Sequence, residues 1–207
     1  MSVVEVAMLP ASVADDVDLV DALCRVVNSA YESAEVGVWR GTYLRTSVTE
    51  LSAAVRAGLV AVARVDGRVV GSICMRQLDV TTGWFGMLAV DPSLGGQGLG
   101  RKLVAFAERR SMSAGMTQMQ LELLAPIEVD IAHLRLLAQW YQRLGYREVA
   151  RASLADNEPE AVPFLAVPCQ IVVQVKPLAP DAPQPRARSL PSTSITPGAS
   201  RPAQGPL

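Results

Sequence analysis

A glycine-rich turn between an apolar strand and an amphipathic helix constrains this chain more than any other feature. We expect the strand at 84–90 and a helix from Leu99, and the turn and first helical residues contain Gly95, Gly96, Gly98 and Gly100. Because glycine has no Cβ, this backbone can adopt positive φ, and several N–H groups can point at one anion at the helix N-terminus. Arg101 and Lys102 strengthen this interpretation, since cations in a first helical turn are disfavoured unless an anion is bound there. The segment therefore predicts a cradle for a pyrophosphate.

The spacing of these glycines excludes two common phosphate-binding loops. A P-loop needs Gly-Lys followed by Ser or Thr, whereas Gly100 is followed by Arg-Lys-Leu. A dinucleotide fingerprint needs Gly-x-Gly-x-x-Gly, and the run from Gly96 to Gly100 is one residue shorter. The loop therefore belongs to another class of phosphate-binding turn.

Two motifs in order carry a resemblance to a known family. The first joins the strand end Leu88-Ala89-Val90-Asp91-Pro92 to the loop Gly95-Gly96-Gln97-Gly98-Leu99-Gly100, and the second is Tyr141-Gln142-Arg143-Leu144-Gly145-Tyr146. Together they resemble the acetyl-coenzyme A loop and the Tyr-x-Lys/Arg-x-Gly-Phe/Tyr signature of the GNAT superfamily of N-acetyltransferases. The resemblance covers residues 4–176, almost all of the segment that we expect to fold.

The periodicity of the chain predicts a mixed α/β domain over residues 1–176. Helices are expected after Asp15 or Asp16, from the capping box Ser47-Val-Thr-Glu50, after the glycine loop, and up to Gly145 as a C-cap. Strands are expected at 59–65, 68–76, 84–90, 118–124, 147–153 and 170–176, with a hairpin at Asp66-Gly67. The resemblance implies a mostly antiparallel sheet flanked by about four helices, with a parallel crossover between the strands at 84–90 and 118–124.

The resemblance also implies a cofactor, a set of contacts and a reaction. Acetyl-coenzyme A would be the acyl donor, attacked directly by an amine. The implied cofactor contacts are Leu88, Ala89 and Val90 in the strand, whose main chain would pair with pantetheine and polarise the carbonyl, and Gly95, Gly96, Gln97, Gly98, Leu99, Gly100 and Arg101 in the loop. Tyr141 would donate a hydrogen bond to the leaving thiolate, although its place on an apolar helical stripe is equally typical of a core aromatic residue.

A general base is harder to assign, because the strand at 84–90 contains no carboxylate. Glu122 alternates with Gln118 and Gln120 on one face of the next strand, opposite Met119, Leu121 and Leu123. It could face the cleft and accept the proton of the amine, be a solvated strand residue, or be replaced by a water-mediated path.

The acceptor site of this family is walled by the first two helices and their connection, here 31–45. Tyr31, Glu35, Trp39 and Arg45 are the candidate substrate contacts. Arg45 could hold a carboxylate and Glu35 an ammonium group, and surface placement of either is the alternative. Small amines, amino acids, peptide N-termini and protein lysines remain open as acceptors.

Three features favour an alternative, a non-catalytic acyl-coenzyme A-binding or interaction module with the same fold. Gly95 stands where the family usually has Gln or Arg, and Ala125 lies near a place where many relatives have Asn. The strand carboxylate of many relatives is also missing. A Tyr141→Phe change is expected to separate an enzyme from such a module.

Composition limits the partners and the compartment. The net charge of −1 argues against a nucleic-acid surface, and no apolar run approaches the length of a membrane span. Three scattered cysteines and one histidine predict buried free thiols and no metal site. We expect a cytoplasmic protein that is either a monomer or a homodimer. Eight of the fourteen prolines fall in 177–207, which predicts a disordered tail.

Overall fold

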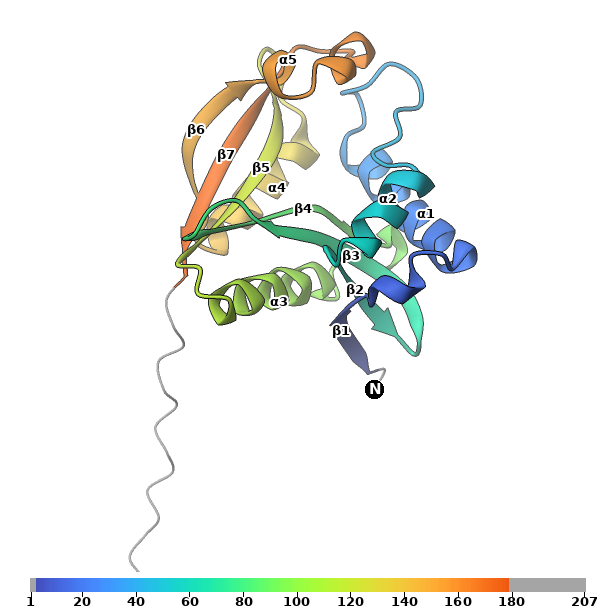
Figure 1. Ribbon diagram of the computed structural model, residues 1–207. Helices are drawn as coiled ribbons and strands as arrows, with labels where there is room; N and C mark the ends of the chain where they lie inside the picture. Colours follow the sequence, from blue (N-terminus) through green and yellow to red (C-terminus); the bar gives the residue numbers. More distant parts are fainter. Residues whose placement is uncertain (1–2, 179–207) are drawn as a thin grey trace, which may run out of the picture.

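The computed structural model describes residues 3–178, which form one mixed sheet with helices on both faces (Figure 1). In chain order the strands and α-helices are β1 (Val4–Met8), α1 (Val17–Ala34), α2 (Val48–Arg56), β2 (Val60–Val65), β3 (Arg68–Gln77), β4 (Thr82–Val90), α3 (Leu99–Ser113), β5 (Gln118–Pro126), α4 (Ala132–Arg143), β6 (Arg147–Ser153), α5 (Leu154–Asn157) and β7 (Cys169–Pro177). Three 3-10 helices lie at η1 (Ala11–Val13), η2 (Pro92–Leu94) and η3 (Pro159–Phe164). The predicted tail lies outside the described residues from 179 onward.

The predicted mixed, mostly antiparallel sheet is confirmed. Its seven strands have the order β1-β2-β3-β4-β5-β7-β6, and every neighbouring pair is antiparallel except the parallel pair β4 and β5. Two features were not predicted from the sequence. Strand β1 forms one edge of the sheet, and the connection between β6 and β7 contains α5 and η3.

Local side-chain chemistry sets the ends of the helices as predicted. The Asp16 side chain accepts a hydrogen bond from the Leu19 N–H and begins α1, while Ser47 and Glu50 form both bonds of the capping box of α2. Gly145 adopts a φ of +100° just after α4, as expected of a C-cap glycine.

The parallel contact between β4 and β5 is short. Only Thr82, Gly83 and Trp84 have partners on β5, whereas nine consecutive residues of β5 pair with β7. Beyond Trp84 the two strands diverge, and in Figure 1 the strands β5 to β7 rise away from β4. The divergence divides the sheet into a β1–β4 half and a β5–β7 half that are joined at one end only.

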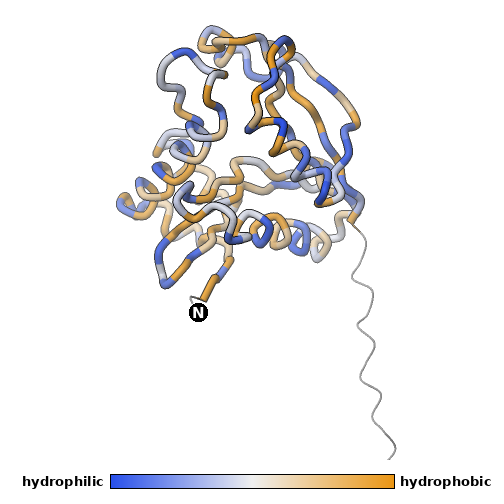
Figure 2. Tube along the Cα trace, turned by 180° about the vertical axis from the view of Figure 1, so that it is seen from behind, coloured by the Kyte–Doolittle hydropathy of each residue, from blue (hydrophilic) through white to orange (hydrophobic). Residues whose placement is uncertain are grey.

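Apolar clusters hold the helices on the two sheet faces. The largest joins α3, the last turns of α4 and both halves of the sheet, with Phe85, Leu103 and Tyr146 in its centre. A second cluster packs α1 and α2 against β2. Along the helices hydrophilic and hydrophobic residues alternate with the turns, as expected of helices with one buried face (Figure 2). Within residues 3–178, none of the helices has the length and apolar character needed to span a membrane.

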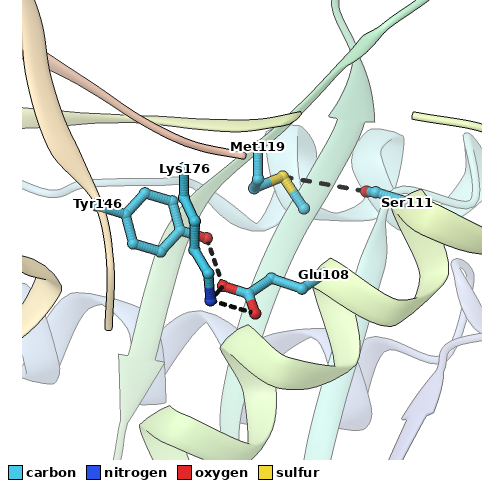
Figure 3. A network of polar contacts seen from close by, with 5 residues as sticks. All are labelled: Glu108, Ser111, Met119, Tyr146 and Lys176. Atoms are coloured by element: carbon cyan, nitrogen blue, oxygen red, sulfur yellow. Dashed lines mark hydrogen bonds and ion pairs between the residues drawn. The ribbon is translucent and has the colours of Figure 1, made fainter. Parts of the chain in front are cut away.

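A partly buried polar network crosses the joined end of the two halves (Figure 3). The Glu108 carboxylate on α3 accepts hydrogen bonds from the Tyr146 hydroxyl at 2.8 Å and from Lys176 Nζ, which lies 2.8 Å from each carboxylate oxygen. Lys176 belongs to β7 and also lies over the Tyr146 ring. The network therefore ties α3 to the β5–β7 half of the sheet.

Candidate active site

The glycine loop places the N-terminus of α3 at the open end of the sheet. Gly98 is the N-cap with a φ of +76°, and Gly96 has a φ of +79°. A Cβ at either position would meet no atom within 4 Å, so backbone conformation and not space requires glycine there. Gly95 has a φ of −55° and Gly100 lies within the helix, so two of the four glycines use the left-handed freedom that the sequence predicted.

Unpaired N–H groups and nearby cations make this helix end suitable for an anion. The first intrahelical hydrogen bond runs from the Lys102 N–H to the Gly98 carbonyl, which leaves the N–H groups of residues 99–101 without helical partners. The first turn contains no acidic residue, and the Arg101 and Lys102 side chains are exposed. These groups fit the pyrophosphate that the sequence predicted.

A β-bulge interrupts β4 where it diverges from β5. Ser72 pairs with Ala89 and Cys74 with Gly86, so Met87 and Leu88 have no residue partners on β3. Neither residue has a partner on β5, and Met87 has a φ of +45°. Backbone polar groups need partners, so this main chain is available to a ligand lying between the strands. The sequence does not signal the bulge, because methionine rarely adopts positive φ.

The predicted contacts Ala89 and Val90 continue the same strand. Each pairs with β3 on one side, with Ser72 and Gly71 respectively, and neither has a partner on the β5 side. Leu88, Ala89 and Val90 therefore all lie along the open edge of β4, as the pantetheine-binding prediction requires.

Tyr141 lies on α4 and belongs to an aromatic cluster that packs against β4. Its ring centroid is 6.0 Å from that of Phe85 and 5.8 Å from that of Tyr146, and the residue is 4% exposed. Within residues 3–178 its hydroxyl forms no hydrogen bond. Burial, with a smaller effect of Tyr31, raises the pKa of Tyr141 well above 10. The phenol therefore stays protonated at neutral pH and can act as a hydrogen-bond donor.

A cavity of about 550 Å³ opens on the α1–α2 side of strands β4 and β5. Its walls come from the connection between α1 and α2, from β3 to β5, and from the segment that holds α5 and η3. The predicted residues Trp39, Arg45 and Glu122 line it, together with Tyr43, Arg76, Trp84, Met87, Asn157, Glu158 and Glu160, among others. Glu122 is exposed to this space and accepts a 3.3 Å hydrogen bond from Gln120.

Two predicted substrate contacts, Tyr31 and Glu35, do not line this cavity. The Arg45 guanidinium lies over the Tyr31 ring, 5.1 Å from its centroid. Glu35 is 8% exposed, and its carboxylate accepts a 2.6 Å hydrogen bond from Trp39 Nε1. Burial raises the pKa of Glu35 although this bond opposes the shift. Glu35 therefore orients Trp39, and the structure gives it no contact with the cavity.

Two connections that are distant in the sequence meet beside the cavity. Trp39 forms an isolated β-bridge with Leu165, and the Arg40 N–H donates to the Phe164 carbonyl at 2.7 Å. Trp39 also stacks on Tyr43, with centroids 3.9 Å apart. In Figure 1 the α1–α2 connection approaches the α5 region at the top of the molecule. Sequence reasoning missed this wall, because its contacts form only between segments far apart in the chain.

Trp84 is another cavity residue that the sequence did not single out. A Cβ at Gly86 would lie 2.3 Å from the Trp84 ring, so the glycine allows the indole to fold along β4. The Arg76 guanidinium lies 4.6 Å from the ring centroid. The Trp84 Nε1–H is enclosed and has no hydrogen-bond partner in the described part of the chain. Such a donor is costly unless a ligand or water supplies an acceptor.

The cysteines take no part in these sites. Cys24, Cys74 and Cys169 are buried free thiols, as predicted, and burial raises the pKa of Cys169 to about 11. Across residues 3–178 no group of three or more potential metal-binding side chains comes together.

Comparison with known proteins supports the resemblance found in the sequence. Residues 56–148 match the acetyltransferase (GNAT) domain family, a segment that contains β2 to β5, the glycine loop and the second motif. No curated protein gives a significant match.

Several solved structures have the same fold. An aminoglycoside 6′-N-acetyltransferase complexed with coenzyme A has a TM-score of 0.61 at 16% identity, covering 86% of this chain and 99% of its own. An agmatine N-acetyltransferase has a TM-score of 0.59 at 15% identity, with 84% and 99% covered. The IAA acetyltransferase from Bacillus cereus has a TM-score of 0.57 at 17% identity, with 85% and 100% covered. The resemblance to the GNAT superfamily and the predicted fold are confirmed.

Proposed function

We propose, from this fold and the matched acetyltransferase domain, that the protein transfers an acetyl group from acetyl-coenzyme A to a primary amine of a small molecule or peptide. The observation that carries the proposal is the open edge of β4, which runs from the bulge at Met87 to the anion-binding end of α3. Solved structures of the same fold include an acetyltransferase with coenzyme A bound. Acetyl-coenzyme A, when bound, supplies an activated acyl group.

The main chain of the loop and of β4 would hold and polarise the donor. The N–H groups at 99–101 and the side chains of Arg101 and Lys102 would bind the pyrophosphate. A main-chain N–H at the bulge, where Met87 and Leu88 lack strand partners, would donate to the acyl carbonyl. Neither task needs a charged side chain on β4.

Tyr141 would stabilise the leaving thiolate as a hydrogen-bond donor. An ordinary thiol has a pKa of about 8.5, far below the raised pKa of the buried phenol, so complete proton transfer from Tyr141 is unfavourable. A hydrogen bond from the neutral phenol remains favourable throughout the neutral range.

Glu122 would accept the proton that the attacking amine must lose. Its carboxylate is exposed to the cavity on β5, across the divergence from the β4 bulge. An amine of pKa about 10.4 is mostly protonated at neutral pH, so a base or a water chain is needed. A relay through cavity water is the alternative to direct transfer.

Release of free thiol from acetyl-coenzyme A across a panel of primary amines tests the proposal. We expect amine-dependent release that Tyr141→Phe greatly slows without abolishing cofactor binding. Binding of acetyl-coenzyme A without release for any amine would instead identify the non-catalytic module. That alternative is favoured by Gly95, by Ala125 and by the absence of a carboxylate on β4.

A further inference from the structure

The acceptor cavity contains more acidic than basic side chains. Its acidic lining residues are Glu50, Glu122, Glu158 and Glu160, and its basic lining residues are Arg45 and Arg76. The excess of two carboxylates gives the cavity a negative field, which its partly enclosed walls concentrate. An acceptor with a positive charge beyond its reacting amine suits this field.

Both arginines already have partners within the protein. Arg45 Nη1 lies 3.8 Å from Glu158 Oε2, and the Arg45 guanidinium lies over the Tyr31 ring. Arg76 lies over the face of Trp84, in a favourable cation–π position. Each guanidinium therefore already has a contact within the protein, and a substrate carboxylate would have to compete with it.

Unlike Glu158, the other three carboxylates of the cavity have no arginine or lysine partner within residues 3–178. Glu122 has only the neutral amide of Gln120 as a partner, and no ion pair joins Glu160 to another residue in the range 3–178. The Ser47 backbone N–H holds the pKa of Glu50 below its usual range, so this carboxylate is charged at neutral pH. The negative charge of the cavity therefore remains available to a ligand.

The aromatic walls suit the same kind of ligand. Trp39 and Tyr43 stack beside the acidic segment that follows α5, and Trp84 lies on the β4 wall. Aromatic faces attract cations and also cover an alkyl chain.

We infer that the acceptor is an aliphatic amine with a second cationic group, and not an amino acid or another carboxylate-bearing amine. The inference rests on the proposed function. The reacting amine lies toward Glu122, and the second cation lies toward Glu160 in the segment that follows α5. A carboxylate in the second position would face like charge and would be disfavoured.

Three probes of similar length test the inference with the full-length protein. They are 1,4-diaminobutane, butylamine and 4-aminobutyrate, which differ only in the group distant from the reacting amine. We expect kcat/KM to be highest for the diamine, by about tenfold over butylamine, and lowest for aminobutyrate. Equal or better use of butylamine or aminobutyrate would overturn the inference and leave acetyl transfer intact. If no amine were acetylated, the proposed function would fail, and calorimetric binding of the three probes would decide the inference separately.

Variants of Glu160 locate the second cation. Glu160→Gln is expected to lower the ratio of kcat/KM for the diamine to that for butylamine by about fivefold. Glu160→Lys is expected to raise the use of aminobutyrate relative to the diamine. Glu128→Gln is the matched control, because Glu128 is an exposed carboxylate that does not line the cavity. The same ratio in Glu160→Gln as in Glu128→Gln would contradict the inference.

Discussion

The two ends of the β4–β5 pair contrast with each other in structure and in expected role. At the joined end, Thr82, Gly83 and Trp84 pair with β5, and Glu108 ties α3 to β7. At the open end the strands have no pairing, the main chain bulges at Met87, and carboxylates face a cavity. We therefore expect stability and ligand binding to depend on opposite ends of one strand pair. Changes at one end should therefore spare the property that belongs to the other.

Loss of the Tyr141 hydroxyl is expected to have the largest effect, and this effect is expected only on kcat. Tyr141→Phe keeps the ring in the cluster with Phe85 and Tyr146, but it removes the donor to the leaving thiolate. We expect kcat to fall about 100-fold, with little change in the free energy of unfolding or in acetyl-coenzyme A affinity. Steady-state thiol release measures kcat, calorimetry measures the affinity, and urea denaturation measures the free energy of unfolding. An unchanged kcat would show that Tyr141 is only a core residue.

Removing the Glu108 charge should act on stability first. Glu108→Gln leaves Lys176, whose side chain is 26% exposed, without its counter-charge, and it weakens the bond from Tyr146. We expect a loss of about 2 kcal/mol in the free energy of unfolding, measured by urea denaturation. Glu148→Gln is the control, because it breaks the exposed pair with Arg151 and should change stability very little. Equal effects of the two variants would contradict the comparison.

Two glycines of the loop form a matched pair for cofactor binding. Gly98 has positive φ with open space around it, so Gly98→Ala is expected to cost about 1 kcal/mol in backbone strain and to distort the helix N-terminus. At Gly100 a Cβ would be 3.6 Å from the Trp140 ring, an ordinary contact in a helix. Calorimetry should therefore show weaker acetyl-coenzyme A binding for Gly98→Ala than for Gly100→Ala. The reverse order would argue against the cradle.

The smallest expected effect is the pH dependence that Glu35 contributes. Because burial raises the pKa of Glu35 in the folded protein above its ordinary value of 4.5, its contribution to stability is complete below that value. The contribution is lost as the pH rises through the folded-state pKa. Glu35→Gln can still accept the Trp39 hydrogen bond and has no proton to lose, so its stability should fall less as pH rises from 4 to 7. Parallel pH profiles of the two proteins in urea denaturation would contradict this account.

Local signals made much of the fold predictable. Asp16 and the Ser47–Glu50 box begin helices through contacts within three residues, and Asp66-Gly67 turns the hairpin between β2 and β3. Strand β1 was missed although its burial alternates, because it pairs only with β2, far along the chain. Short edge strands of this kind depend on tertiary pairing more than on their own sequence.

In the candidate site, too, only the features that depend on local sequence were predictable. The glycine loop, Tyr141 and the strand at Leu88 follow from motifs, and in the structure Tyr141 packs against Phe85 of that strand. The bulge at Met87, the Trp39–Leu165 bridge and the packing of Trp84 against Gly86 depend on register, distant segments and side-chain shape. None of these has a signal in residue spacing, which is why Trp39, Arg45 and Glu122 were predicted as site residues while the contribution of Trp84 and of the α5–η3 segment to the cavity emerged only from the structure.

The most direct test of the central claim is a thermal-unfolding scan of the full-length protein with and without acetyl-coenzyme A. We expect the open end of the β4–β5 pair to bind this molecule. A ligand at a hundred times its Kd should add about 2.7 kcal/mol to the free energy of unfolding, and Tm should rise clearly. We predict that rise in the unmodified protein and in Tyr141→Phe, and a smaller one in Gly98→Ala. No rise at millimolar acetyl-coenzyme A would contradict the claim that the open end is a cofactor site.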